Sequence, residues 1–251
     1  CIRKSPPVIR NTISGMIKDK YCPTDILMLL INCVTAGMNF VIGGEPGSGK
    51  TEFVKFLMQF IPLEKRVITI EDSLEIHYSE INSDADAVEL RVGEDFSYTD
   101  AIKACLRQNP MWLVLSEARS VEVTSLIEQW STGVNGITTI HLDDLRKLPD
   151  RIENMMNDVN DASRLENRIY RYVNVGVLIR REKEADGGIR RYIDQMCFYV
   201  REEHKNRVYM LVEDGEIISR KIPADIAKRL KLAGIDEFFW CDLDPFIKRG
   251  M

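Results

Sequence analysis

The residues with the clearest chemical meaning are three glycines spaced around one lysine and one threonine. Gly44, Gly47, Gly49, Lys50 and Thr51 match the pattern Gly-x-x-x-x-Gly-Lys-Thr. Such glycines let the backbone curl so that successive N–H groups point at phosphate oxygens, beside the positive end of the following helix. We expect the lysine to reach the β- and γ-phosphates of ATP and the threonine hydroxyl to hold Mg²⁺. The predicted nucleotide-binding residues form one run: Gly44, Glu45, Pro46, Gly47, Ser48, Gly49, Lys50, Thr51 and Glu52.

Acidic residues at the ends of two later apolar runs are candidates for catalysis. Glu71 and Asp72 follow the run 67–70, and Glu117 follows the run 112–115. A carboxylate at the carboxyl end of a buried strand can polarise water or hold the hydration shell of a metal. We predict a Mg²⁺ site at Thr51, Asp72 and Glu117, partly through water, and either Glu71 or Glu117 as the general base. The first acidic cluster is also compatible with an exposed turn.

One histidine and several arginines complete the candidate site. His141 ends a third apolar run and could donate a hydrogen bond to the γ-phosphate, although a structural role is the commoner one for a lone histidine. Arg107 and Arg119 flank the run 112–115 and are expected near the site in the same chain. Arg91 could cross a subunit interface and stabilise transition-state charge there, and a surface ion pair is the alternative for each arginine. The predicted catalytic residues are Lys50, Glu71, Arg107, Glu117, Arg119 and His141.

The elements that position these residues alternate between strand and helix. A short apolar run, 39–43, enters the glycine-rich loop, and helical periodicity resumes over 51–60. Further strand-like runs at 66–70, 112–115 and 136–142 indicate a mostly parallel sheet covered by helices on both faces, an α/β fold. From Val173 the runs lengthen, at 175–181, 189–200 and 208–212. Asp186-Gly187-Gly188 separates the first two runs and Glu213-Asp214-Gly215 follows the last, which predicts an antiparallel hairpin region near the C-terminus.

Composition and charge limit the function classes that this chain can belong to. The 251 residues carry a formal net charge of −5, and acidic and basic residues are mixed along the chain. The sequence therefore lacks the basic stripe expected of a protein that binds nucleic acid. The apolar stretch 26–42 contains polar residues and leads into the loop, which predicts a helix and a strand and not a membrane span. The six cysteines lack metal-ligand spacing and are expected to be free thiols in a reducing cytosol.

The chain begins with cysteine and carries no signal peptide, so we expect it to start inside a longer protein with an upstream domain. Three regions are predicted. Residues 1–38 form a lead-in segment and helix, residues 39–222 form the catalytic domain with its C-terminal hairpins, and residues 223–251 form a helix and tail.

The order of these motifs resembles that of the secretion-superfamily ATPases, which power type II and type IV secretion, conjugation and type IV pili. The run 44–51 resembles their Walker A box, and 69–72 with Glu75 resembles their aspartate box. The segment 106–119 resembles their atypical Walker B box, and 138–141 their histidine box. Residues 44–52 and the turn 131–133 look most like the CpaF-type ATPases of tight-adherence pili. Ser116 and Met111 depart from this pattern, where Gly and Asp are common.

This resemblance implies a RecA-like P-loop NTPase fold with ATP and Mg²⁺ as cofactors. It also implies a homohexameric ring on the cytoplasmic face of the plasma membrane, where ATP turnover would move an inner-membrane platform protein. The alternative is a RecA-like nucleic-acid translocase or helicase, for which the arginine pairs 180–181 and 190–191 around one turn are the sole hint. A regulatory nucleotide binder without hydrolysis is a third possibility, against which the acids and the histidine argue.

Overall fold

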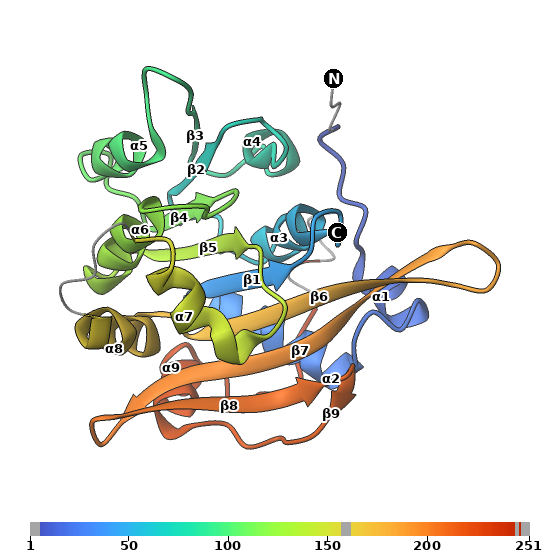
Figure 1. Ribbon diagram of the computed structural model, residues 1–251. Helices are drawn as coiled ribbons and strands as arrows, with labels where there is room; N and C mark the ends of the chain where they lie inside the picture. The colour runs from blue at the N-terminus through green and yellow to red at the C-terminus, as the bar shows by residue number, and fades with distance from the viewer. Residues whose placement is uncertain (1–5, 157–161, 244–245, 247–251) are drawn as a thin grey trace.

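A computed structural model describes residues 6–156, 162–243 and 246 of the chain (Figure 1). Its centre is one sheet of nine strands in the order β3-β2-β4-β5-β1-β6-β7-β8-β9. The strands from β3 to β6 run parallel, and those from β6 to β9 run antiparallel. The predicted α/β class, with hairpins added after the parallel core, is confirmed.

The parallel strands are short, and each one crosses the core. Their carboxyl ends lie along the same side of the sheet. The parallel strands are β1 (Phe40–Gly44), β2 (Val67–Glu71), β3 (Ala87–Arg91), β4 (Trp112–Leu115), β5 (Asn135–Ile140) and the first half of β6 (Val175–Lys183). All residues of β1, β2 and β4 are buried, which explains why their sequences are mostly apolar. The edge strand β3 is partly exposed.

The antiparallel strands are β7 (Ile189–Glu202), β8 (Lys205–Glu213) and β9 (Glu216–Ile217). Gly187, with φ 86°, lies in the turn between β6 and β7, and Asp214 and Gly215, with φ 51° and 77°, form the turn after β8. Left-handed residues at these turns match the twist of a hairpin. In Figure 1 the β6–β7 hairpin extends well beyond the rest of the sheet on the side of α1.

Helices cover both faces of the sheet. The first face carries α2 (Thr24–Thr35), α3 (Lys50–Met58) and α9 (Ala224–Leu232), whose apolar side chains share one core cluster with Phe40 and Ile42. The second face carries α5 (Tyr98–Cys105), α6 (Glu122–Ser131), α7 (Leu148–Glu153) and α8 (Ala162–Tyr172), which share a cluster with Val41. Successive side chains of β1 therefore point to opposite faces of the sheet and contribute to both core clusters. Shorter elements are α1 (Ile13–Lys18), α4 (Tyr78–Ile81) and the 3₁₀ turn η1 (Leu145–Lys147).

The apolar stretch 26–42 forms a helix and a strand, as predicted. In the part of the chain that the structure describes, no helix is long and apolar enough to span a membrane. Asn32, in α2, donates from its side-chain amide to the backbone oxygens of Phe238 and Trp240 at 3.0 and 2.7 Å. A residue of the predicted lead-in region, Asn32, is therefore hydrogen-bonded to the predicted tail.

Helix α5 begins with a reciprocal capping box. Ser97 is the N-cap: its hydroxyl accepts from the Asp100 N–H, and the Asp100 carboxylate accepts from the Ser97 N–H. The five described cysteines are free thiols, as expected, and Cys1 lies outside the described residues.

Gly136 in β5 allows β5 to lie close to β4. A Cβ on this residue would lie 2.4 Å from the Leu113 carbonyl oxygen and 2.4 Å from Trp130 Nε1. We expect Gly136→Ala to push β4 from β5 and lower the free energy of unfolding by about 1–3 kcal/mol, measured by denaturant titration. Gly93→Ala, where nothing lies within 4 Å of the new Cβ, is the matched control with little change. Equal stability of the two variants would contradict this packing argument.

Candidate nucleotide-binding site

The glycine-rich loop joins the carboxyl end of β1 to the first turn of α3, which confirms the strand-loop-helix context predicted for it. Gly44, Gly47 and Gly49 have φ values of 147°, 75° and 97°. A Cβ on Gly44 would lie 2.6 Å from the Ile179 carbonyl oxygen and 2.6 Å from Ser48 Oγ, so this position admits only glycine. The curled backbone leaves the first N–H groups of α3 without helical partners, which is the arrangement that binds anions.

Lys50 is folded back onto the loop that carries it. Its Nζ donates to the carbonyl oxygens of Gly44 and Glu45 at 2.8 and 2.9 Å and lies 3.3 Å from His141 Nδ1. The residue is only 8% exposed. Burial lowers the pKa of the Lys50 amine to about 8, and the nearby Glu117 charge partly offsets this shift. The lysine is therefore a weakly hydrated cation at the mouth of the loop.

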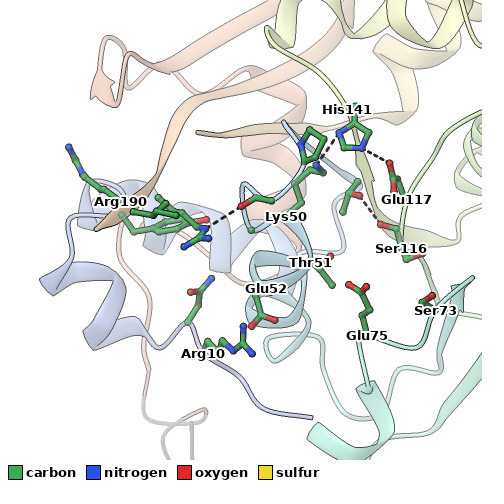
Figure 2. Close-up of a pocket in the computed structure, with 18 of the residues that line it drawn as sticks. Arg10, Lys50, Thr51, Glu52, Ser73, Glu75, Ser116, Glu117, His141 and Arg190 are labelled. Atoms are coloured by element: carbon green, nitrogen blue, oxygen red, sulfur yellow. Dashed lines mark hydrogen bonds and ion pairs between the residues drawn. The ribbon is translucent and has the colours of Figure 1, made fainter. Parts of the chain in front are cut away.

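His141 connects this lysine to an acid. The ring lies at the end of β5, and its Nε2 lies 2.8 Å from Glu117 Oε1 (Figure 2). When Lys50 donates to Nδ1, the ring proton must be on Nε2 and is donated to Glu117. When the ring is an imidazolium, Nδ1 can instead donate to the Gly44 oxygen, 3.2 Å away. In either state the histidine links the loop to the carboxylate at the end of β4.

Arg119 holds two predicted metal ligands side by side. Its guanidinium donates to Glu117 Oε2 at 2.8 Å and to Asp72 Oδ2 at 2.9 Å. The hydrogen bond to Glu117 is the main reason that the pKa of Arg119 is above its usual range. The ends of β2 and β4 are thus joined through one side chain, as the prediction of a cis position for Arg119 requires.

Glu71 and Glu75 lie in different environments. Glu71 has no exposed surface, and its Oε2 accepts from the N–H groups of Glu75 and Ile76 at 3.0 and 3.1 Å. Burial raises the pKa of the Glu71 carboxyl to about 7, against these two hydrogen bonds. Its Oε1 is buried without a partner in the described part of the chain. The Glu75 side chain, in contrast, lines the site together with Ser73.

A cavity of about 920 Å³ brings most of the predicted residues together. In Figure 2, Glu75 and Glu117 lie on one side of Thr51, and Arg190 lies on the other. The cavity does not include Glu71 or Arg107. Contrary to expectation, the exposed Arg107 lies in the turn before β4, at the opposite edge of the sheet from the loop. The predicted site residues that line the cavity are Pro46, Gly47, Gly49, Lys50, Thr51, Glu52, Asp72, Glu117, Arg119 and His141.

The residues present fit a phosphate chain and Mg²⁺. Ser48 Oγ, within the loop, is buried and has no hydrogen-bond partner among the described residues. Thr51, Asp72 and Glu117 line the same cavity. No cluster of three or more His, Cys, Asp or Glu side chains in the described ranges could hold a metal alone. Mg²⁺ does not need one, since it is usually held by one or two protein oxygens, phosphates and water.

Several residues in or beside the cavity were not predicted from the sequence. Tyr98 places its hydroxyl 3.1 Å from the Asp72 N–H and 3.2 Å from Ser116 Oγ, between the ends of β2 and β4. No motif marks this tyrosine, because the contact depends on how α5 packs. The other additions come from the N-terminal segment and the β6–β7 hairpin: Arg10, Asn11, Asp19, Tyr21, Glu184, Ile189, Arg190 and Arg191. The adjacent arginines 190–191 were the only sequence signal.

The fold and the loop together define a P-loop, RecA-like nucleotide-binding domain. A family model described as "Type II/IV secretion system protein" matches residues 14–177, so the chain belongs to this family. The match covers the loop and both acidic strand ends, as well as His141.

Individual relatives agree with the family match. VirB11, a type IV secretion system protein of Brucella suis, is 29% identical over 69% of this chain and 51% of its own length. An uncharacterized protein of Bacillus anthracis is 37% identical over 57% of this chain and 33% of its own. The chain thus spans about a third to a half of these relatives.

Two solved structures share the fold. The Brucella suis VirB11 ATPase, solved with sulphate, aligns over 78% of this chain and 65% of its own with a TM-score of 0.60 and 23% identity. The pilus retraction motor PilT, solved with ADP, aligns over 92% and 58% with a TM-score of 0.61 and 19% identity. The two alignments show that this chain shares its fold with both structures.

The environment of Glu71 predicts a stability effect. Glu71→Ala would leave the N–H groups of Glu75 and Ile76 without their acceptor, and each unsatisfied buried donor costs about 1–3 kcal/mol. We expect a lower midpoint of urea unfolding for this variant. Glu71→Gln keeps one acceptor oxygen and should be the more stable of the two. If Glu71→Ala unfolds at the wild-type urea concentration, the carboxylate does not hold this loop.

Proposed function

We propose that this chain is the ATP-hydrolysing part of a motor subunit in a type II or type IV secretion or pilus assembly system. The observation that carries the proposal is the continuous contact from Lys50 through His141 to Glu117 at the mouth of a glycine-rich loop. This contact joins the group that would bind phosphate to the group that would act on water. The family match supports secretion over the nucleic-acid alternative.

The loop and its neighbours have separate roles in this proposal. Backbone N–H groups within residues 44–52, except at Pro46, and the Lys50 ammonium hold the phosphates of ATP. The Thr51 hydroxyl, with Asp72 and Glu117 through water, holds Mg²⁺. When bound, the metal supplies charge neutralisation for phosphoryl transfer. Arg119 keeps the two carboxylates in place, since it donates to both.

Of the two candidate bases, the geometry supports Glu117. Its carboxylate lines the cavity and is 19% exposed, whereas Glu71 is fully buried and occupied by backbone N–H groups. Glu117 would orient the attacking water and accept its proton. His141, in contact with both Lys50 and Glu117, would report whether a γ-phosphate is present. Glu75, on the same side of the cavity, is a further carboxylate within this region.

The assembly is proposed from the family and from the relatives' names. The chain would form a homohexameric ring on the cytoplasmic face of the plasma membrane and act on an inner-membrane platform protein. Arg91, exposed on the edge strand β3, and the exposed Arg107 remain candidates for a contribution to a neighbouring subunit's site. The CpaF-type, tight-adherence role is the finer proposal, based on residues 44–52 and 131–133.

Glu117→Gln separates binding from hydrolysis. The substitution keeps the shape of the side chain and removes the charge that would accept a proton, so ATP should still bind while turnover falls about 10²- to 10⁴-fold. Turnover and equilibrium ATP binding are measured on the same preparation. Glu94→Gln, an exposed acid outside the cavity, is the control with wild-type turnover. Wild-type turnover in the Glu117 variant would exclude it as the base, and lost binding would assign it a metal or structural role.

The dependence of ATPase rate on protein concentration tests the ring and the alternative function together. If an active site needs a residue from a neighbour, the rate per subunit rises with concentration as subunits associate. We expect this rise with Mg²⁺ present and no change on adding single-stranded DNA. A rate that increases only with DNA would favour a nucleic-acid translocase, and a rate per subunit that is constant over all concentrations would argue against a shared site.

A further inference from the structure

Two arginines face each other on the β6–β7 hairpin. Arg181 of β6 and Arg191 of β7 are direct register partners in the antiparallel ladder. Direct partners project from the same face of a sheet, where like charges repel and destabilise the pairing. No acidic side chain in residues 6–156, 162–243 and 246 forms an ion pair with either guanidinium. The hairpin therefore holds two positive charges together without a counter-charge from the protein.

The arginines at the neighbouring positions of the same hairpin have side-chain partners. Tyr192 donates to Glu182 at 2.6 Å, and Arg190 lies over the Tyr192 ring at 4.9 Å. Arg180 forms an ion pair with Asp194 at 2.5 Å. Arg180 thus has an acidic partner and Arg190 an aromatic one, whereas Arg181 and Arg191 have neither among the described residues.

The unneutralised pair lies against the glycine-rich loop. Arg191 Nε donates to the Gly47 carbonyl oxygen at 3.4 Å, and its Cδ lies 3.1 Å from the place where a Cβ on Gly49 would be. Arg181 Nη1 lies 2.9 Å from the equivalent place on Gly47. The absence of side chains on Gly47 and Gly49 lets both arginines approach the loop. Arg191 lines the same cavity as Lys50.

We propose that Arg191, which lines the cavity, and Arg181, which lies against Gly47 of the loop outside the cavity lining, bind the phosphate groups of the nucleotide held by the loop of the same chain. This inference rests on the function proposed above. A guanidinium presents several N–H donors in a plane and matches the spacing of phosphate oxygens. The phosphates supply the counter-charge that the pair lacks, so nucleotide binding relieves the repulsion across the hairpin. The β6–β7 hairpin is therefore part of the nucleotide site, and the loop and the hairpin respond to the same ligand.

Competition with an inorganic polyphosphate tests whether the arginines act on phosphates. We would measure equilibrium binding of Mg-ATP and of inorganic tripolyphosphate to Arg181→Gln, Arg191→Gln and wild type. Each arginine variant should bind both ligands about 10- to 100-fold more weakly, the range for loss of one hydrogen bond to a charged group. Arg191→Lys keeps the charge and should retain more affinity than Arg191→Gln. Lys50→Ala, which removes the loop cation, provides the reference for lost phosphate binding.

Arg207→Gln is the matched control, since it removes the same charge from an exposed position on β8. Arg207 pairs with Val200, nine residues along β7 from Arg191 and so about 30 Å away at the rise of a strand. Its affinity for both ligands should equal that of wild type. Without nucleotide, the two arginine variants should unfold at the same temperature as wild type or at a higher one, because each removes a like-charge contact.

The outcomes separate this inference from the proposed function. Wild-type affinity in both arginine variants, together with lost binding in Lys50→Ala, would overturn the hairpin's role and leave the ATP site intact. Weaker ATP binding with unchanged tripolyphosphate binding would also overturn it, because the arginines would then act on another part of the nucleotide. A lower unfolding temperature in either variant would contradict the repulsion argument. A wild-type chain that binds neither ligand would overturn both proposals.

Discussion

The placement of the Lys50 ammonium is the constraint on which the site depends. A buried cation is costly unless polar groups replace its water. Here the replacements are two carbonyl oxygens of its own loop and the ring of His141. The loop must therefore curl as it does, and β5 must end beside β1 so that the ring can reach the amine. Glu117, through His141, then provides the negative charge that stabilises this buried cation.

The order of strands provides this arrangement. Because β2, β4, β5 and β1 are parallel neighbours, their carboxyl ends lie along one edge, and residues distant in sequence meet there. Asp72, Glu117, His141 and Lys50 follow in that spatial order. Arg119 and Tyr98 add contacts between the ends of β2 and β4. The site is thus a row of strand ends joined by side-chain hydrogen bonds. The packed core beneath it holds these strands in place.

The glycine-rich loop, its flanking elements and the buried strands could be predicted, because short stretches of sequence carry the signals for them. The loop motif specifies its own strand and helix, and the apolar runs 67–70 and 112–115 indicate buried strands because both faces are covered. Contacts between residues far apart in the sequence could not be predicted. Whether Glu71 or Glu75 faces the cavity depends on how the chain turns after β2, which no periodicity records. Arg107 is near Glu117 in sequence, yet β4 separates them by its whole length. The roles of Tyr98 and the hairpin arginines depend on packing between elements far apart in the chain.

The outer side of β8 has a consequence for how copies of the chain can meet. The two-residue strand β9 pairs only with Val212 and Glu213, so most of that side of β8 has no strand beside it in the described part of the chain. Unpaired strand edges invite uncontrolled addition of further strands, and charged side chains discourage it. Lys205 and Arg207 are exposed along this stretch. The positive charges along this stretch therefore discourage copies of the chain from joining their sheets strand to strand.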